Sequence, residues 1–220
     1  MNNQDFEAYA DLKKFNSHIA STWDVAFTEA LKYAGKVVSE VKLLDYGCGD
    51  GKYFRYWIDR GLLPENINGL EVSKKRVSRC HQIGWKNALQ LLPQASLPYA
   101  DGSFDIINCM EVIEHIPAEE GKRVIDELRR VIRPRGVLLI STPNYPVKRF
   151  YDFCDAVLQH KWARLKDDPT HVTPFNHKLM TQLLRRKFTQ IEAWPFKQGF
   201  LYKRFQHPAL LHKLFFLCRP

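Results

Sequence analysis

The sequence has no closely spaced cysteine pairs and no long apolar run. Its 220 residues contain five cysteines, and none of them forms a Cys-x-x-Cys pair. An odd, scattered set argues against a disulfide framework and a cysteine-based zinc site, and it indicates a reducing setting. Residues 1–14 mix charged and polar side chains where a signal peptide needs apolar ones, and no apolar run approaches the roughly 18 residues that span a bilayer. We therefore expect a cytoplasmic protein that is at most peripheral to the inner face of a membrane.

Acidic residues are missing from the C-terminal part of the chain. None follows Glu192, whereas five basic residues do: Lys197, Lys203, Arg204, Lys213 and Arg219. The whole chain has 33 Lys and Arg against 24 Asp and Glu, a formal net charge of +9. A positive excess in one region indicates an anionic partner, such as nucleic acid, phosphate or an acidic membrane, or else a basic face that contacts only solvent.

The chain has neither internal repeats nor a low-complexity linker, and its length suits one domain. Short apolar runs predict five strands, at residues 41–46, 67–72, 87–92, 104–110 and 136–141. Helices are predicted within residues 5–34, after an N-cap at Ser73, and at residues 118–132 and 176–187, with a further strand at 188–194. Strands that alternate with helices favour a mostly parallel sheet covered on both faces. The expected fold class is α/β, with a doubly wound sheet.

These patterns divide the single domain, residues 1–220, into four parts. We expect an N-terminal helical cap at residues 1–40 and a cofactor-binding core at residues 41–142. Residues 143–175 are predicted to be an irregular insertion on the substrate side, because long irregular stretches in compact domains are usually functional. Residues 176–220 are expected to supply a C-terminal helix, a strand and a basic amphipathic tail.

A glycine turn follows the first predicted strand. It reads Asp45-Tyr46-Gly47-Cys48-Gly49-Asp50-Gly51, and glycines let the backbone turn sharply and lie directly against a ligand. Glu71 comes 20 residues after Gly51, at the tip of the second strand, where an acid can accept both hydroxyls of a ribose. Asp45 would repel a pyrophosphate and suits a cationic amino-acid group. The candidate cofactor-binding residues are Asp45, Gly47, Cys48, Gly49, Gly51, Glu71, Val72 and Met110.

The glycine turn, Glu71 and two later segments together resemble the class I S-adenosylmethionine-dependent methyltransferases. The later segments are residues 97–105 and 133–140, similar to the approaches to the fourth and fifth strands in that family. The resemblance, which extends to the methyltransferase type 11 group, implies a Rossmann-like methyltransferase fold and S-adenosylmethionine as cofactor. That family closes its sheet with an antiparallel seventh strand. Residues 199–205 match it poorly, so we expect an irregular or missing seventh strand.

An acid-acid-histidine turn, Glu111-Val112-Ile113-Glu114-His115, follows the fourth predicted strand. Positions i, i+3 and i+4 share a face of a helical turn, so the three polar side chains are expected to converge at the ligand-binding edge of the sheet. The segment resembles the Glu-x-x-Glu-His motif of the ubiquinone-biosynthesis O-methyltransferases and the small-RNA 2′-O-methyltransferases. That resemblance implies one divalent metal ion held by Glu111, Glu114, His115 and a later histidine, for which His171 has a matching position.

Two other roles stay open for the same turn. His115 or His171 is able to accept the proton of a hydroxyl nucleophile without a metal. Alternatively, the acids cap the next helix and His115 only packs. We take His115, His171 and Glu111 as the candidate catalytic residues.

The expected activity is S-adenosylmethionine-dependent O-methylation of a small molecule or of a lipid-linked glycan or quinone-type substrate. One alternative is an RNA 2′-O-methyltransferase, which the charge and the metal-like motif favour. The chain shows no appended RNA-binding module, however, so nucleic acid is the less favoured partner. A second alternative is a non-catalytic nucleotide-fold binding protein.

The tail, residues 207–220, has apolar residues at helical intervals beside a basic flank: Leu210, Leu211, Leu214, Phe215, Leu217 and Cys218. This pattern predicts a short amphipathic helix. Such a helix would lie on an anionic membrane surface, or it would cover the domain in place of a weak seventh strand.

Overall fold

One seven-stranded sheet organises the protein. The computed structural model describes residues 7, 10, 21–92, 95–195 and 199–220. The sheet order is β3-β2-β1-β4-β5-β7-β6, and the strands are β1 (Leu43–Tyr46), β2 (Ile67–Glu71), β3 (Ala88–Gln90), β4 (Phe104–Met110), β5 (Ile132–Pro143), β6 (Gln190–Ala193) and β7 (Lys213–Arg219). Neighbouring strands from β3 to β5 are parallel, whereas β7 is antiparallel to both β5 and β6.

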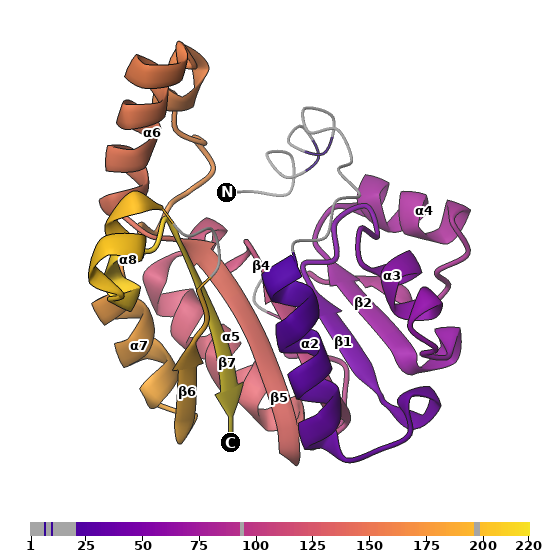
Figure 1. Cartoon of the computed structure of the whole chain (residues 1–220). Coiled ribbons are helices and arrows are strands. Elements are labelled where there is room, and N and C mark those ends of the chain that lie inside the picture. The colour runs from indigo at the N-terminus through magenta and orange to yellow at the C-terminus, as the bar shows by residue number, and fades with distance from the viewer. Residues whose placement is uncertain (1–6, 8–9, 11–20, 93–94, 196–198) are drawn as a thin grey trace.

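Helices cover both faces of this sheet (Figure 1). Helices α2 (Ser21–Ala34), α3 (Phe54–Asp59) and α4 (Lys74–Gln82) contribute side chains to one buried cluster, around Trp23 and Trp57. Helices α5 (Ala118–Val131) and α7 (His177–Arg185) contribute to the other, around Leu128 and Met180. The prediction of a doubly wound α/β fold is therefore confirmed.

The predicted local signals match the structure in the sheet core. All five predicted strands are present, and β5 begins earlier than expected, at Ile132. Ser73 caps α4 through its hydroxyl, which accepts a hydrogen bond from the Arg76 amide at 3.2 Å. The Asn176 side chain caps α7 in the same way, at 2.9 Å from the Leu179 amide. Of the predicted N-terminal cap, α2 is observed, and residues 1–6, 8–9 and 11–20 lie outside the described residues.

The tail is not an amphipathic helix, so that prediction is wrong. Residues 208–210 form the short 3-10 turn η5 (Pro208–Leu210), and residues 213–219 form β7, whose residues 214–218 are all buried. A short apolar run buried on both faces of a sheet cannot be told from a helix by its period alone. The expectation of an irregular or missing seventh strand is also wrong, because β7 is regular and residues 199–205 contain helix α8 (Phe200–Phe205) instead.

The insertion after β5 is more regular than predicted. It contains helix α6 (Val147–Gln159) and the 3-10 turn η4 (Trp162–Leu165). Figure 1 shows α6 rising from the end of the sheet where the parallel strands terminate, away from the body of the domain. The described residues include no helix that is long and apolar enough to cross a membrane, and all five cysteines are free thiols.

Candidate active site

The glycine turn lies against the acid-acid-histidine turn. Gly47 has a φ of +78°, and a Cβ added there would lie 2.3 Å from a methyl carbon of Val112. The amides of Gly47 and Cys48 both donate to the carbonyl of Leu70, at 2.8 and 3.0 Å. Only glycine tolerates this conformation and this contact together. The two motifs found separately in the sequence therefore form one site at the carboxyl edge of β1 and β4.

Glu71 is held against the glycine turn. Its carboxylate accepts hydrogen bonds from the Gly49 amide at 2.9 Å and from the Ser73 amide at 3.0 Å. Burial raises the pKa of Glu71 above its usual value, although these amides oppose the shift. A carboxylate has about four acceptor positions, so the carboxylate of Glu71 has capacity left for a ribose hydroxyl beside these amides and that of Val72. The ribose contact itself stays a prediction.

Asp45 is a buried carboxylate with one unpaired oxygen. The Asn108 amide donates to its Oδ1 at 2.7 Å, whereas its Oδ2 is buried without a hydrogen-bond partner. Trp23 fixes the Asn108 side chain by donating to its Oδ1 at 3.0 Å. Burial raises the pKa of Asp45 to about 7, although the hydrogen bond from Asn108 opposes the shift. The position of Asp45 suits a cationic ligand group, which would supply the missing partner.

The remaining predicted cofactor residues lie around the same turn. Cys48 is buried, and a hydrogen bond with Cys80 and burial both raise the pKa of its thiol. Val72 follows β2, and its carbonyl accepts a hydrogen bond from Gln90 at 3.1 Å. Met110 ends β4 and is half-buried. Their contacts with a cofactor remain predictions.

Glu111 is bound by other residues and is not grouped with the other predicted metal ligands. It has a φ of +58°, and its carboxylate accepts a hydrogen bond from Ser141 at 2.7 Å and pairs with Lys213 at 2.7 Å. Burial favours the protonated form, but the charge and hydrogen bond of Lys213, together with the Ser141 hydroxyl and the charge of His171, outweigh it and lower the pKa of Glu111. The group of potential ligands in the described part of the chain contains Glu114, His115 and His171 without Glu111. The predicted four-ligand set is therefore only partly assembled.

Glu114 is the least satisfied acid of the site. It is 1% exposed, and neither oxygen of its carboxylate has a hydrogen-bond partner. Burial, together with the negative charge of Glu111, raises the pKa of Glu114 well above its usual value. The Thr142 hydroxyl and the Glu114 amide oppose this shift without reversing it, so the carboxylate is destabilised as an anion and binds either a proton or a cation.

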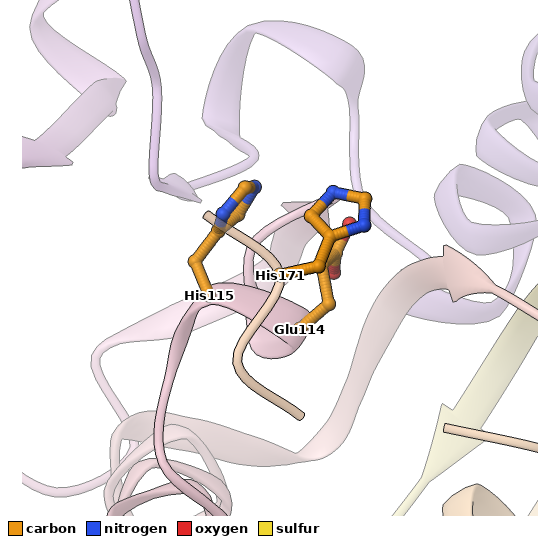
Figure 2. A group of neighbouring side chains, drawn as sticks. All are labelled: Glu114, His115 and His171. Carbon is orange, nitrogen blue, oxygen red and sulfur yellow. The ribbon is translucent and has the colours of Figure 1, made fainter. Parts of the chain in front are cut away.

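The two predicted histidines face one another. Their ring centroids lie 4.9 Å apart, and one ligand atom from each ring and one from Glu114 all lie within 4.8 Å of one another. Figure 2 shows that His115 comes from the turn after β4, the 3-10 helix η3 (Ile113–His115), whereas His171 comes from a separate segment that crosses it. Residues distant in sequence thus build one polar cluster.

Neighbouring groups fix the tautomers of both rings. Nδ1 of His115 lies 3.1 Å from the carbonyl of Thr170, which can only accept a hydrogen bond, so Nδ1 carries the proton. Nδ1 of His171 lies 3.0 Å from the hydroxyl of Tyr145, and that hydroxyl donates to Asp167 at 2.9 Å. The proton of neutral His171 is therefore also on Nδ1. In both neutral rings, Nε2 has the lone pair that accepts a proton or binds a metal.

Several residues of the site were not predicted as site residues. Lys213 was assigned to the tail, and the antiparallel insertion of β7 that brings it to Glu111 has no short-range signal. Asn108 contacts Asp45, Tyr145 contacts His171, and Thr170 contacts His115. Each of these three residues therefore positions another residue of the site. The asparagine within an apolar strand was the one available signal, because a buried amide needs polar partners.

Residues 44–140 match the family model of a methyltransferase domain. The chain is 27% identical over 158 residues to the ubiquinone biosynthesis O-methyltransferase of Histophilus somni (strain 2336), which is 63% of this chain and 65% of that protein. It is 30% identical over 114 residues to the protein of the same name from Pseudomonas aeruginosa (strain UCBPP-PA14), which is 50% of this chain and 47% of that protein. The chain thus spans about half to two thirds of the length of these curated relatives.

Solved structures share the fold at low sequence identity. A SAM-dependent methyltransferase from Archaeoglobus fulgidus matches with a TM-score of 0.62 at 14% identity, over 91% of this chain and 95% of that one. A protein from Pyrococcus horikoshii OT3 matches with the same TM-score at 15% identity, over 98% and 99% of the two chains. Residues 44–140 are thus similar to methyltransferase domains, and the fold is that of a solved SAM-dependent methyltransferase, which confirms the resemblance predicted from the sequence.

Proposed function

We propose that this protein is an enzyme that transfers the methyl group of S-adenosylmethionine to a hydroxyl group of a small or lipid-linked, quinone-type molecule. The observation that carries the proposal is the pair of imidazoles, His115 and His171, beside the glycine turn. A hydroxyl must lose its proton when it attacks a methyl group, and a neutral imidazole is a suitable acceptor near pH 7. The O-methyltransferase names of the two curated relatives support a hydroxyl acceptor.

The residues of this chain then have separate tasks. When bound, S-adenosylmethionine supplies an electron-poor methyl group. The glycine turn and Glu71 bind the cofactor, and Asp45 pairs with its cationic amino group. Val112, in contact with Gly47, sets the distance between the cofactor turn and the histidines. Most of the rate enhancement comes from this positioning of nucleophile and methyl group, and Nε2 of His115 or His171 accepts the hydroxyl proton.

As an alternative to the histidine base, we propose that Glu114, His115 and His171 hold one divalent cation; a metal-bound Nε2 accepts no proton, so the hydroxyl proton would then pass to solvent. The buried, partnerless carboxylate of Glu114 and the Nε2 lone pairs of the two rings support this donor set. One carboxylate with two imidazoles suits Mn²⁺, Fe²⁺ or Zn²⁺ better than Mg²⁺. Glu111 does not fit, because the Lys213 ammonium already occupies its carboxylate. A bound cation would increase the acidity of a substrate hydroxyl.

Two isosteric substitutions in the same motif test the metal proposal. Glu114→Gln should lose most of the bound metal, whereas Glu111→Gln should retain it, since only Glu114 belongs to the ligand cluster. The measurements are metal analysis of protein purified without chelator, and activity after chelation and re-addition. Full activity in excess chelator would leave the histidine-base mechanism alone. Loss of metal in both variants would restore Glu111 as a ligand.

An acceptor panel tests the methyl transfer. A catechol with a prenyl side chain and the matching aromatic amine are incubated with the protein and S-adenosylmethionine, and products are identified by mass spectrometry. The proposal expects a methyl ether from the catechol and no product from the amine. Methylated amine alone would refute it. A high ultraviolet absorbance ratio from co-purified nucleic acid, with methylation of RNA, would favour the RNA alternative instead.

A further inference from the structure

Helix α6 has an apolar face that the rest of the described chain leaves exposed. Phe150, Phe153 and Val157 are spaced at i, i+3 and i+7, so they share one side of the helix, and Leu158 lies in its exposed last turn. These four side chains are 45–78% exposed, whereas Tyr151 and Ala156 on the other side are buried. A surface helix normally turns its apolar side toward the core. Here the orientation is reversed, and the apolar side of α6 faces solvent.

Two neighbouring elements extend this face. Trp162 and Leu165 of η4 are 58% and 44% exposed, and Phe200 and Phe205 of α8 are 55% and 61% exposed. The rings of Phe150 and Phe200 lie 6.0 Å apart, which joins α6 to α8. Of the sixteen exposed large apolar side chains in the described ranges, eight belong to α6, η4 and α8. We call this surface the α6–α8 face. Such a concentration marks an interaction site rather than scattered surface residues.

The exposed charges around the α6–α8 face are positive, whereas Asp152 of α6 is buried and Asp155 is half-buried. Lys161 and Lys166 flank η4, Lys203 and Arg204 lie on α8, and all four are exposed. Residues 156–166 and 199–211 contain no Asp or Glu. Exposed Phe and Trp beside Lys and Arg are typical of segments that lie in the interface of an anionic membrane. A protein partner would need acidic groups opposite the same residues.

The α6–α8 face is connected to the active site. Tyr145, which orients His171, also donates to Asp167, and Asp167 accepts from Lys148 on α6 at 2.9 Å. Leu201 of α8 is bonded to α6 through the Tyr151 hydroxyl, at 3.1 Å. Figure 1 shows α6 standing at the end of the sheet that carries the site. A surface bound to this face would lie next to the place where substrate must enter.

We propose that the α6–α8 face docks the protein on an anionic phospholipid bilayer. The face takes the role that the sequence suggested for the tail, which is buried as β7. This inference does not depend on the methyl transfer, because docking uses only surface residues. Each exposed Lys or Arg that reaches the surface contributes about fivefold to the partition coefficient, and each buried aromatic ring roughly tenfold or more.

Vesicle co-sedimentation measures the docking directly. Vesicles of phosphatidylcholine alone are compared with vesicles that also contain phosphatidylglycerol, and the full chain should bind only the latter. Phe153→Ser with Leu158→Ser should reduce binding by a hundredfold or more, and Lys203→Gln with Arg204→Gln by about 30-fold. The matched controls are Val37→Ser with Leu63→Ser, and Lys32→Gln with Lys86→Gln, which change exposed residues on other elements.

Tryptophan fluorescence gives an independent measurement. Trp162 is exposed, whereas Trp23, Trp57 and Trp85 are fully buried and Trp194 is half-buried against the core. Vesicle binding should therefore shift the emission to the blue, and Trp162→Phe should remove the shift while retaining most of the binding. Calorimetry with S-adenosylmethionine confirms that each variant is folded, and it separates a failure of docking from a failure of the proposed activity.

Three outcomes would overturn the proposal. The first is equal binding to neutral and anionic vesicles, or to neither. The second is unchanged binding of the Phe153→Ser, Leu158→Ser variant. The third is a dimer of the wild-type chain that this variant converts to a monomer without any vesicle binding, which would assign the α6–α8 face to a second copy of the chain.

Discussion

Asp45 should make cofactor binding depend on pH. Its carboxyl group has a pKa of about 7 in the folded protein, because it is 2% exposed and has one partnerless oxygen. A cationic amino group of the ligand binds only the ionised form. Affinity for S-adenosylmethionine should therefore rise about tenfold per pH unit below pH 7 and level off above it.

The carboxyl group of Asp45 should lower the stability of the fold as the pH rises, whereas it increases cofactor affinity. Its pKa is raised from 3.8 to about 7 on folding, so between these values the folded state binds more protons than the unfolded state. The free energy of unfolding should fall as the pH rises through that window, by at most about 4 kcal/mol for a shift of about three units. Asp45→Asn keeps an acceptor for Asn108 but has no proton to lose, so it should lack this fall.

Two assays on wild type and Asp45→Asn check the reasoning. Calorimetric titration with S-adenosylmethionine between about pH 5.5 and 8 should give a sloping affinity for wild type and a weak, flat affinity for the variant. Urea unfolding without cofactor should show that the free energy of unfolding of Asp45→Asn increases relative to that of wild type as the pH rises. A wild-type affinity independent of pH would refute the role of Asp45, and a constant stability difference would refute its raised pKa.

Three further perturbations have definite expectations. Glu71→Ala should weaken S-adenosylmethionine binding by roughly 1.5–3 kcal/mol, measured by calorimetry, because hydrogen bonds to a charged group are lost. Gly47→Ala forces a Cβ to within 2.3 Å of Val112, and it should lower the unfolding free energy by about 1–3 kcal/mol in urea titrations and abolish cofactor binding. Removal of residues 207–220 deletes an interior strand, so the truncated chain should lose its cooperative thermal transition; a well-folded truncated protein would contradict the assignment of β7.

The sequence was most informative where local patterns coincide with burial. Residues 43–46 of β1 are buried without exception, and a short, mostly apolar run beside a glycine turn indicates such a strand. The apolar residues of β7 were predicted to form a helix, because the pairing of β7 with β5 and β6 is long-range and leaves no local signal. The glycine turn and the histidines were predicted as separate motifs, but the Gly47–Val112 contact that joins them depends on the packing of β1 against β4.

The site residues show the same difference between local patterns and long-range packing. Glu114, His115 and His171 were grouped through a resemblance, and the structure brings them together. Glu111 was predicted to belong to the same group, but its carboxylate forms a salt bridge with Lys213 instead. No sequence pattern around residue 213 indicates a partner about a hundred residues away. The apolar spacing along α6 exists in the sequence, but spacing does not say whether an apolar side faces the core or solvent.

The position of β7 in the sheet determines when β6 is able to join the sheet. β7 follows β6 in the chain but lies between β5 and β6, so β6 has no neighbour in the sheet until residues 213–219 have been synthesised and inserted. Until then, the side of β5 that receives β7 is an open edge able to pair with other chains. Insertion of β7 also delivers Lys213 to Glu111. The last strand to enter the sheet therefore completes the charge balance of the site, and partly folded chains lack it.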